Sequence, residues 1–128
     1  MKLLLDTHTF IWWDSEPQKL PSVTLLLCQD EANTLLLSVA SVWEMQIKIQ
    51  LGKLTLRQPL EVLITGQMDA NGLQILPVGL PHVLALRELP AHHKDPFDRL
   101  LIAQANVEEA TLLSSDPIMS QYSVRLNK

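Results

Sequence analysis

The chain has 128 residues, which suits one ordinary domain with its own hydrophobic core and is short for two. Apolar residues make up 47% and charged residues 19%, a balance that excludes a disordered chain. The net charge of −4 argues against an open basic platform for nucleic acid, unless carboxylates are gathered in one site and neutralised there by divalent cations. With a single cysteine, no signal-peptide core and no apolar run of membrane length, we expect a soluble cytoplasmic protein.

Short apolar runs alternate with segments of helical length. In chain order, the pattern predicts a strand at 2–5, helices at 9–13 and 22–30, a strand at 34–37, helices at 40–51 and 60–70, a strand at 73–76, helices at 81–89 and 96–108, and strands at 111–113 and 123–126. The strands lack a strict alternation of apolar and polar residues, which is typical of a mostly parallel sheet covered on both faces. We therefore expect one α/β domain over residues 1–128, with about five strands.

Two aspartates directly follow predicted strands. Asp6 comes after the apolar run LLL, and Asp116 comes after TLLSS. In open α/β sheets, ligands collect at the carboxyl ends of the strands, so these two acids would meet at one edge if both strands are central and parallel. Each also has a structural explanation: Asp6 would cap the short helix after Thr7, and Asp116 before Pro117 has the pattern of a helix N-cap.

Two further acids lie on the apolar sides of predicted helices. A projection at about 100° per residue places Asp98 on the apolar stripe of its helix and Glu44 at the border of a wide apolar face. Buried carboxylates are rare unless something pairs with them. The alternatives are a capping box that begins at Asp95 for Asp98, and an i,i+4 ion pair with Lys48 for Glu44.

The histidines and tryptophans have simpler explanations than a site. His8, His92 and His93 match no zinc spacing, although metal ligation by them stays possible, and His82 is expected to be exposed near a helix start. The tryptophans lie within apolar periodic segments, so we expect packing in the core or at a dimer surface and not base stacking: Trp12, Trp13 and Trp43.

Four segments together resemble a known family across nearly the whole chain. They are LLLDTHTFIWW, SVASVWEMQIKIQLGKL, HHKDPFDRLLIAQA and LLSSDPIMSQYSVRL. The chain resembles PIN-domain proteins, in particular the toxins of bacterial toxin-antitoxin pairs called VapC. The resemblance implies a three-layer α/β/α sandwich around a parallel sheet, and an acidic cluster that holds Mg²⁺ or Mn²⁺ and cleaves RNA.

The resemblance also implies roles for particular residues. Asp6, Glu44, Asp98 and Asp116 match the family's catalytic and metal-binding acids, with the first and third as principal ligands. Asp95 does not match and is interpreted as a cap. Ser114 stands where the family often has threonine, and it keeps the hydroxyl. The implied partners are an RNA substrate, a small antitoxin that covers the acidic groove, and a second copy of the chain in a homodimer, with no membrane.

This chemistry suits an oxygen-rich site without histidine or cysteine. Mg²⁺ prefers carboxylate oxygens and retains several waters, so a few acids suffice to hold it. An aspartate-nucleophile phosphatase would need a second aspartate two residues after the first, and that position is His8. The remaining alternative is a non-catalytic RNA-binding or scaffold domain in which the acids serve only as caps and ion pairs.

Overall fold

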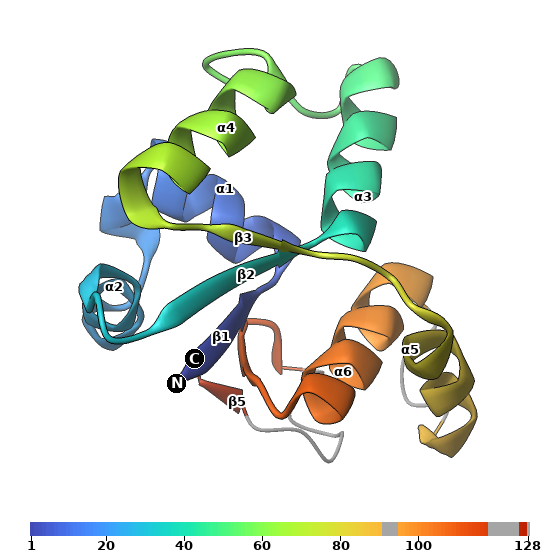
Figure 1. Ribbon diagram of the computed structural model, residues 1–128. Helices are drawn as coiled ribbons and strands as arrows, with labels where there is room; N and C mark the ends of the chain where they lie inside the picture. The colour runs from blue at the N-terminus through green and yellow to red at the C-terminus, as the bar shows by residue number, and fades with distance from the viewer. Residues whose placement is uncertain (91–94, 118–125, 128) are drawn as a thin grey trace.

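A computed structural model of the chain describes residues 1–90, 95–117 and 126–127. Its sheet has five strands, all paired in parallel, in the order β3-β2-β1-β4-β5 (Figure 1). The strands are β1 (Lys2–Leu5), β2 (Thr34–Ser38), β3 (Gln74–Leu76), β4 (Thr111–Leu113) and β5 (Leu126–Asn127). The α-helices are α1 (Thr7–Ser15), α2 (Ser22–Gln29), α3 (Val39–Gln50), α4 (Leu60–Asn71), α5 (Leu80–Ala85) and α6 (Pro96–Glu108), and two 3₁₀ turns occupy Pro17–Lys19 and Leu86–Glu88.

The predicted α/β class is confirmed, and most differences lie at the ends of elements. The fifth strand lies at Leu126–Asn127, and most of its predicted range falls outside the described residues. The prediction of one helix over 81–89 was wrong. The N–H of Leu86 donates to the carbonyl of Val83, so the chain tightens into a 3₁₀ turn ahead of Pro90. None of the helices within the described ranges is long and apolar enough to cross a membrane.

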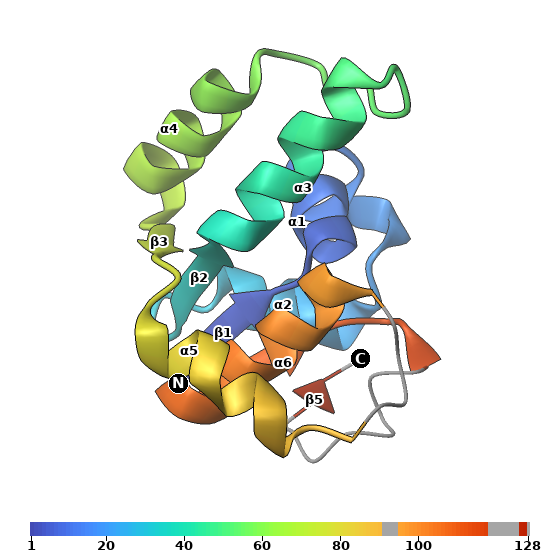
Figure 2. The same cartoon turned by 90° about the vertical axis from the view of Figure 1, so that its right-hand side faces the viewer.

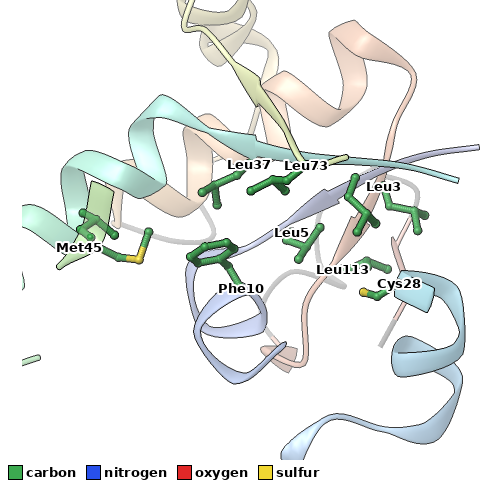
Figure 3. Close-up of a cluster of buried hydrophobic side chains, with 10 residues drawn as sticks. Leu3, Leu5, Phe10, Cys28, Leu37, Met45, Leu73 and Leu113 are labelled. Carbon is green, nitrogen blue, oxygen red and sulfur yellow. The ribbon is translucent and has the colours of Figure 1, made fainter. Parts of the chain in front are cut away.

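The leucines of the strands are buried on both faces of the sheet. Side chains on one face pack with helices α1 to α4 around Phe10 and Met45, and Figure 3 shows this cluster. Side chains on the other face pack against α6, which Figure 2 shows beneath the sheet with α5. The first face includes Leu3, Leu5, Leu35, Leu37 and Leu113, and the second includes Leu4, Leu36, Leu76 and Leu112. Burial on both faces explains why the strands read as continuous apolar runs, and it gives the three layers that were predicted.

The register of the sheet brings three strand ends to one level. Leu5 pairs with Leu37 of β2 and with Leu113 of β4, so the residues that follow these three leave the sheet together. Helices α1 and α3 begin directly after β1 and β2, and their N-terminal ends therefore lie at this edge. The unpaired N–H groups of a helix N-terminus carry partial positive charge, which favours carboxylates nearby.

Candidate active site

A pocket of about 450 Å³ lies at this edge of the sheet, and all four predicted acids line it. Asp6 comes from the end of β1, Glu44 from α3, Asp98 from the first turn of α6, and Asp116 from the segment after β4. Four separate parts of the chain thus contribute carboxylates to one cavity. Their metal-binding and catalytic roles remain predictions, whereas their convergence is an observation.

Asp6 is held between α1 and β4. Its Oδ1 accepts a hydrogen bond of 2.8 Å from the N–H of Thr9, so the predicted cap is confirmed. The backbone N–H of Asp6 and the hydroxyl of Thr9 both donate to the carbonyl oxygen of Leu113, at 3.1 and 3.0 Å. Within the described residues, Oδ2 accepts no hydrogen bond, so capping and a role in the pocket are compatible.

Glu44 is buried, with 8% of its surface exposed. Its Oε1 accepts a hydrogen bond of 2.6 Å from the hydroxyl of Thr7, and its Oε2 lies 3.1 Å from Nζ of Lys48. The i,i+4 ion pair that was the structural alternative for Glu44 therefore forms, but both of its residues line the pocket. A buried carboxylate needs such partners, because its charge has lost the surrounding water.

The start of α6 is arranged by Asp95. Its Oδ1 accepts hydrogen bonds from the N–H groups of Phe97 and Asp98, at 2.9 and 3.2 Å, which confirms the predicted cap. Asp95 also lines the pocket, a placement that its interpretation as a cap did not anticipate. Asp98 is half-buried on the same turn.

An aromatic contact joins α3 to α6 near the pocket. The rings of Trp43 and Phe97 meet edge to face, with 5.3 Å between their centroids. Trp43 is 63% exposed and lies on a face of α3 that the described chain leaves largely open, so of its two expected placements, the core or a dimer surface, the core does not apply. Trp12 is half-buried and lines the pocket beside His8, whereas Trp13 packs against the core as expected. Whether a dimer covers Trp43 stays a prediction.

Ser114 supports the last acid. It is buried, and its hydroxyl accepts a hydrogen bond of 3.2 Å from the N–H of Asp116. The hydroxyl that replaces the family's threonine thus holds the turn after β4. Residues 118–125 lie outside the described part of the chain, so capping by Asp116 stays a prediction.

The pocket is strongly acidic. Among the described residues, its lining has a single lysine, Lys48, and no arginine, against five carboxylates: Asp6, Glu44, Asp95, Asp98 and Asp116. Nevertheless, in the described ranges no three His, Cys, Asp or Glu side chains lie close enough together to hold one metal ion. His8 lines the pocket, while His92 and His93 lie outside the described residues. Carboxylate and hydroxyl oxygens are the ligands that Mg²⁺ and Mn²⁺ prefer, and such ions need only one or two carboxylates when water completes the shell. The donor set therefore fits a hard divalent ion.

Two polar clusters away from the pocket had no signal in the sequence. His82, predicted to be exposed, is only 5% exposed: its Nδ1 accepts from the N–H of Gly79, and its Nε2 lies 2.9 Å from Oε2 of Glu108. The carboxylate of Asp14 accepts hydrogen bonds from Nη2 and Nε of Arg57, at 2.9 and 3.1 Å. Burial alone would raise the pKa of Asp14, but the hydrogen bonds from Arg57 and its neighbours outweigh it and lower that pKa. Both clusters join segments far apart in the sequence, which no local pattern reveals.

Comparison with known proteins agrees with this fold. The sequence profile of the PIN domain matches residues 3–124. The fold is similar to VapBC2 from Rickettsia felis, solved with a DNA fragment from its promoter, at 17% identity and a TM-score of 0.73, over 99% of this chain and 98% of that one. FitAcB from Neisseria gonorrhoeae is similar at 19% identity and a TM-score of 0.64, over 98% and 96% of the two chains. VapBC-1 from nontypeable Haemophilus influenzae is similar at 15% identity and a TM-score of 0.57, over 100% and 98%.

No curated protein matches the chain significantly. The structural similarities, all below 25% identity, show a shared fold, and the profile match spans nearly the entire sequence. The family that the four sequence segments indicated is thereby confirmed. This chain belongs to the PIN domain family.

Proposed function

We propose that this chain is an endoribonuclease that depends on Mg²⁺ or Mn²⁺ and acts as the toxin of a toxin-antitoxin pair. The observation that carries the proposal is the convergence of carboxylates from four chain segments on one pocket at the carboxyl edge of the sheet. Membership of the PIN domain family and similarity to the VapBC and FitAcB structures support it.

The four predicted acids would hold the ion, either directly or through water: Asp6, Glu44, Asp98 and Asp116. When bound, a hard divalent ion supplies positive charge to the phosphate in the transition state and makes water a better nucleophile near neutral pH. The cap from the N–H of Thr9 fixes the orientation of Asp6, and the hydroxyl of Thr7 fixes that of Glu44. Among the described residues, Oδ2 of Asp6 accepts no hydrogen bond, whereas Oε2 of Glu44 contacts Lys48.

The partners follow from the same resemblance and the charge of the pocket. An acidic pocket attracts basic side chains, so an antitoxin that inserts one would block both the ion and the RNA. We propose such an antitoxin and a homodimer as the assembled state, and the similarity to the VapBC and FitAcB structures supports a partner protein. Localisation in the cytoplasm belongs to the same proposal.

RNA cleavage by the purified protein tests the activity. Asp6→Asn and Asp98→Asn should each abolish cleavage in Mn²⁺ while circular dichroism and the thermal midpoint still report a folded protein. Asp69→Asn is the matched control, because it removes one negative charge from the exposed surface of α4, outside the pocket. Full cleavage by either pocket variant, or by the wild-type protein in excess EDTA, would show the proposal to be wrong.

The non-catalytic alternative gives a different result. A scaffold or RNA-binding domain would bind RNA without cutting it, and Mn²⁺ would not raise its thermal midpoint. The proposed nuclease should instead be stabilised by Mn²⁺, since an ion that binds the folded state alone shifts the unfolding equilibrium. Asp98→Asn should reduce that shift.

A further inference from the structure

Among the described residues, Lys48 is the one lysine or arginine that lines the acidic pocket. It lies on α3, one turn after Glu44, and its Nζ contacts Oε2 of that residue at 3.1 Å. Its side chain remains 37% exposed. A cation thus stands inside the cavity that gathers the carboxylates, in a position open to a ligand.

Stabilising the helix is a weak explanation for this lysine. An i,i+4 ion pair on a helix contributes little, and Glu44 already receives the hydroxyl of Thr7 on its other oxygen. An ammonium group has three N–H donors, and the contact with Glu44 accounts for one of them among the described residues. The remaining donors have room to meet an anion in the pocket.

We propose that Lys48 is a phosphate-binding residue of this pocket and contacts a phosphodiester group of single-stranded RNA beside the acids. This inference rests on the proposed function for its substrate class. An RNA strand that approaches five carboxylates meets repulsion, and a divalent ion offsets only part of that charge. The ammonium supplies further positive charge where the backbone must lie. Each phosphate neutralised in this way adds to the salt dependence of binding.

Binding measured apart from cleavage tests the proposal. Fluorescence anisotropy would follow a labelled single-stranded oligoribonucleotide binding to the full chain in Ca²⁺, which offsets carboxylate charge, with a gel to verify that the strand stays intact. Lys48→Gln should raise Kd about tenfold, as expected for the loss of one hydrogen bond to a charged group. It should also reduce the slope of log Kd against log salt by about 0.7, the value for one phosphate of a single strand. Lys48→Arg should retain most of the slope.

The matched control is Lys53→Gln, an exposed lysine outside the pocket, which should leave the slope unchanged. A Mn²⁺ titration without RNA separates the two possible roles. If Lys48 only pairs with Glu44, Lys48→Gln would change Mn²⁺ affinity and leave the RNA slope equal to wild type. Equal slopes and equal Kd values for wild type and Lys48→Gln, including no measurable binding by either, would overturn the inference.

The two proposals fail independently. If RNA binds through Lys48 and is never cut in Mn²⁺, the nuclease function is wrong and the phosphate contact stands. If RNA is cut and Lys48→Gln leaves the salt slope unchanged, the nuclease function stands and the phosphate contact is wrong.

Discussion

The hydroxyl of Thr7 holds one oxygen of Glu44, and Thr7→Val removes that hydrogen bond while nearly keeping the size of the side chain. Both residues are buried, and the donor and acceptor oxygens are 2.6 Å apart. Hydrogen bonds to charged groups contribute about 1.5–3 kcal/mol to stability. When a buried acceptor loses its donor, water does not fully replace the lost hydrogen bond. We therefore expect Thr7→Val to lower the free energy of unfolding by about 2 kcal/mol.

Thr24 supplies the matched control. It is buried like Thr7, but its hydroxyl has no hydrogen-bond partner among the described residues. Thr24→Val removes a hydroxyl that has lost its water on burial and has no hydrogen bond with the described residues in return. The substitution should therefore be neutral or stabilise the protein by up to about 1 kcal/mol. The same substitution should therefore lower the free energy of unfolding at Thr7 and should not lower it at Thr24.

Urea unfolding followed by circular dichroism measures both variants at pH 7 without divalent ions. A loss of about 2 kcal/mol corresponds to roughly 1 M in urea midpoint at an m value of about 2 kcal/mol/M. It also corresponds to about 7 °C in thermal midpoint for a chain of this length. Glu44→Gln combined with Thr7→Val should show coupling between the two changes. Equal midpoints for Thr7→Val and Thr24→Val would refute the assigned role of the Thr7 hydroxyl.

Two further predictions concern stability. Gly66 lies inside α4, and Gly72 is the residue directly after its end. A Cβ added at either position would meet no atom within 4 Å. Gly66→Ala should stabilise the protein by about 0.5–1 kcal/mol, whereas Gly72→Ala should destabilise it by about 1 kcal/mol because Gly72 has a φ of 69°. Urea midpoints that shift in the same direction would contradict this. The pKa of Asp14 is lowered in the folded state, so its charged form stabilises the protein above the unfolded pKa near 3.8, and this contribution is lost as pH falls through the lower folded value. Asp14→Asn should therefore destabilise the protein at pH 7 and do so less at pH 2.5, and a constant difference between the two pH values would be incompatible with the Asp14–Arg57 contacts.

The local sequence determined the elements of the sheet edge. Continuous leucine runs with no polar alternation indicated strands buried on both faces, and Asp95 followed by Pro96 marked the start of α6, because both signals arise from neighbouring residues. The same local patterns placed acids at strand ends, and parallel pairing made their meeting at one edge predictable. The roles of those acids came from resemblance to the PIN family and not from the patterns.

Only the tertiary structure decided which groups surround those acids. The sequence pattern favoured a surface ion pair for Glu44 and Lys48. In the structure, Thr7 of another helix donates a hydrogen bond to the same carboxylate, and all three residues line the pocket. The sequence pattern predicted an exposed His82. In the structure this residue is buried and contacts Glu108, which lies 26 residues away in the sequence. Helix and strand periodicities describe which side of an element is apolar, but they contain no information about which element packs there. Burial and hydrogen bonding between distant segments depend on that packing, so they appear only in the folded chain.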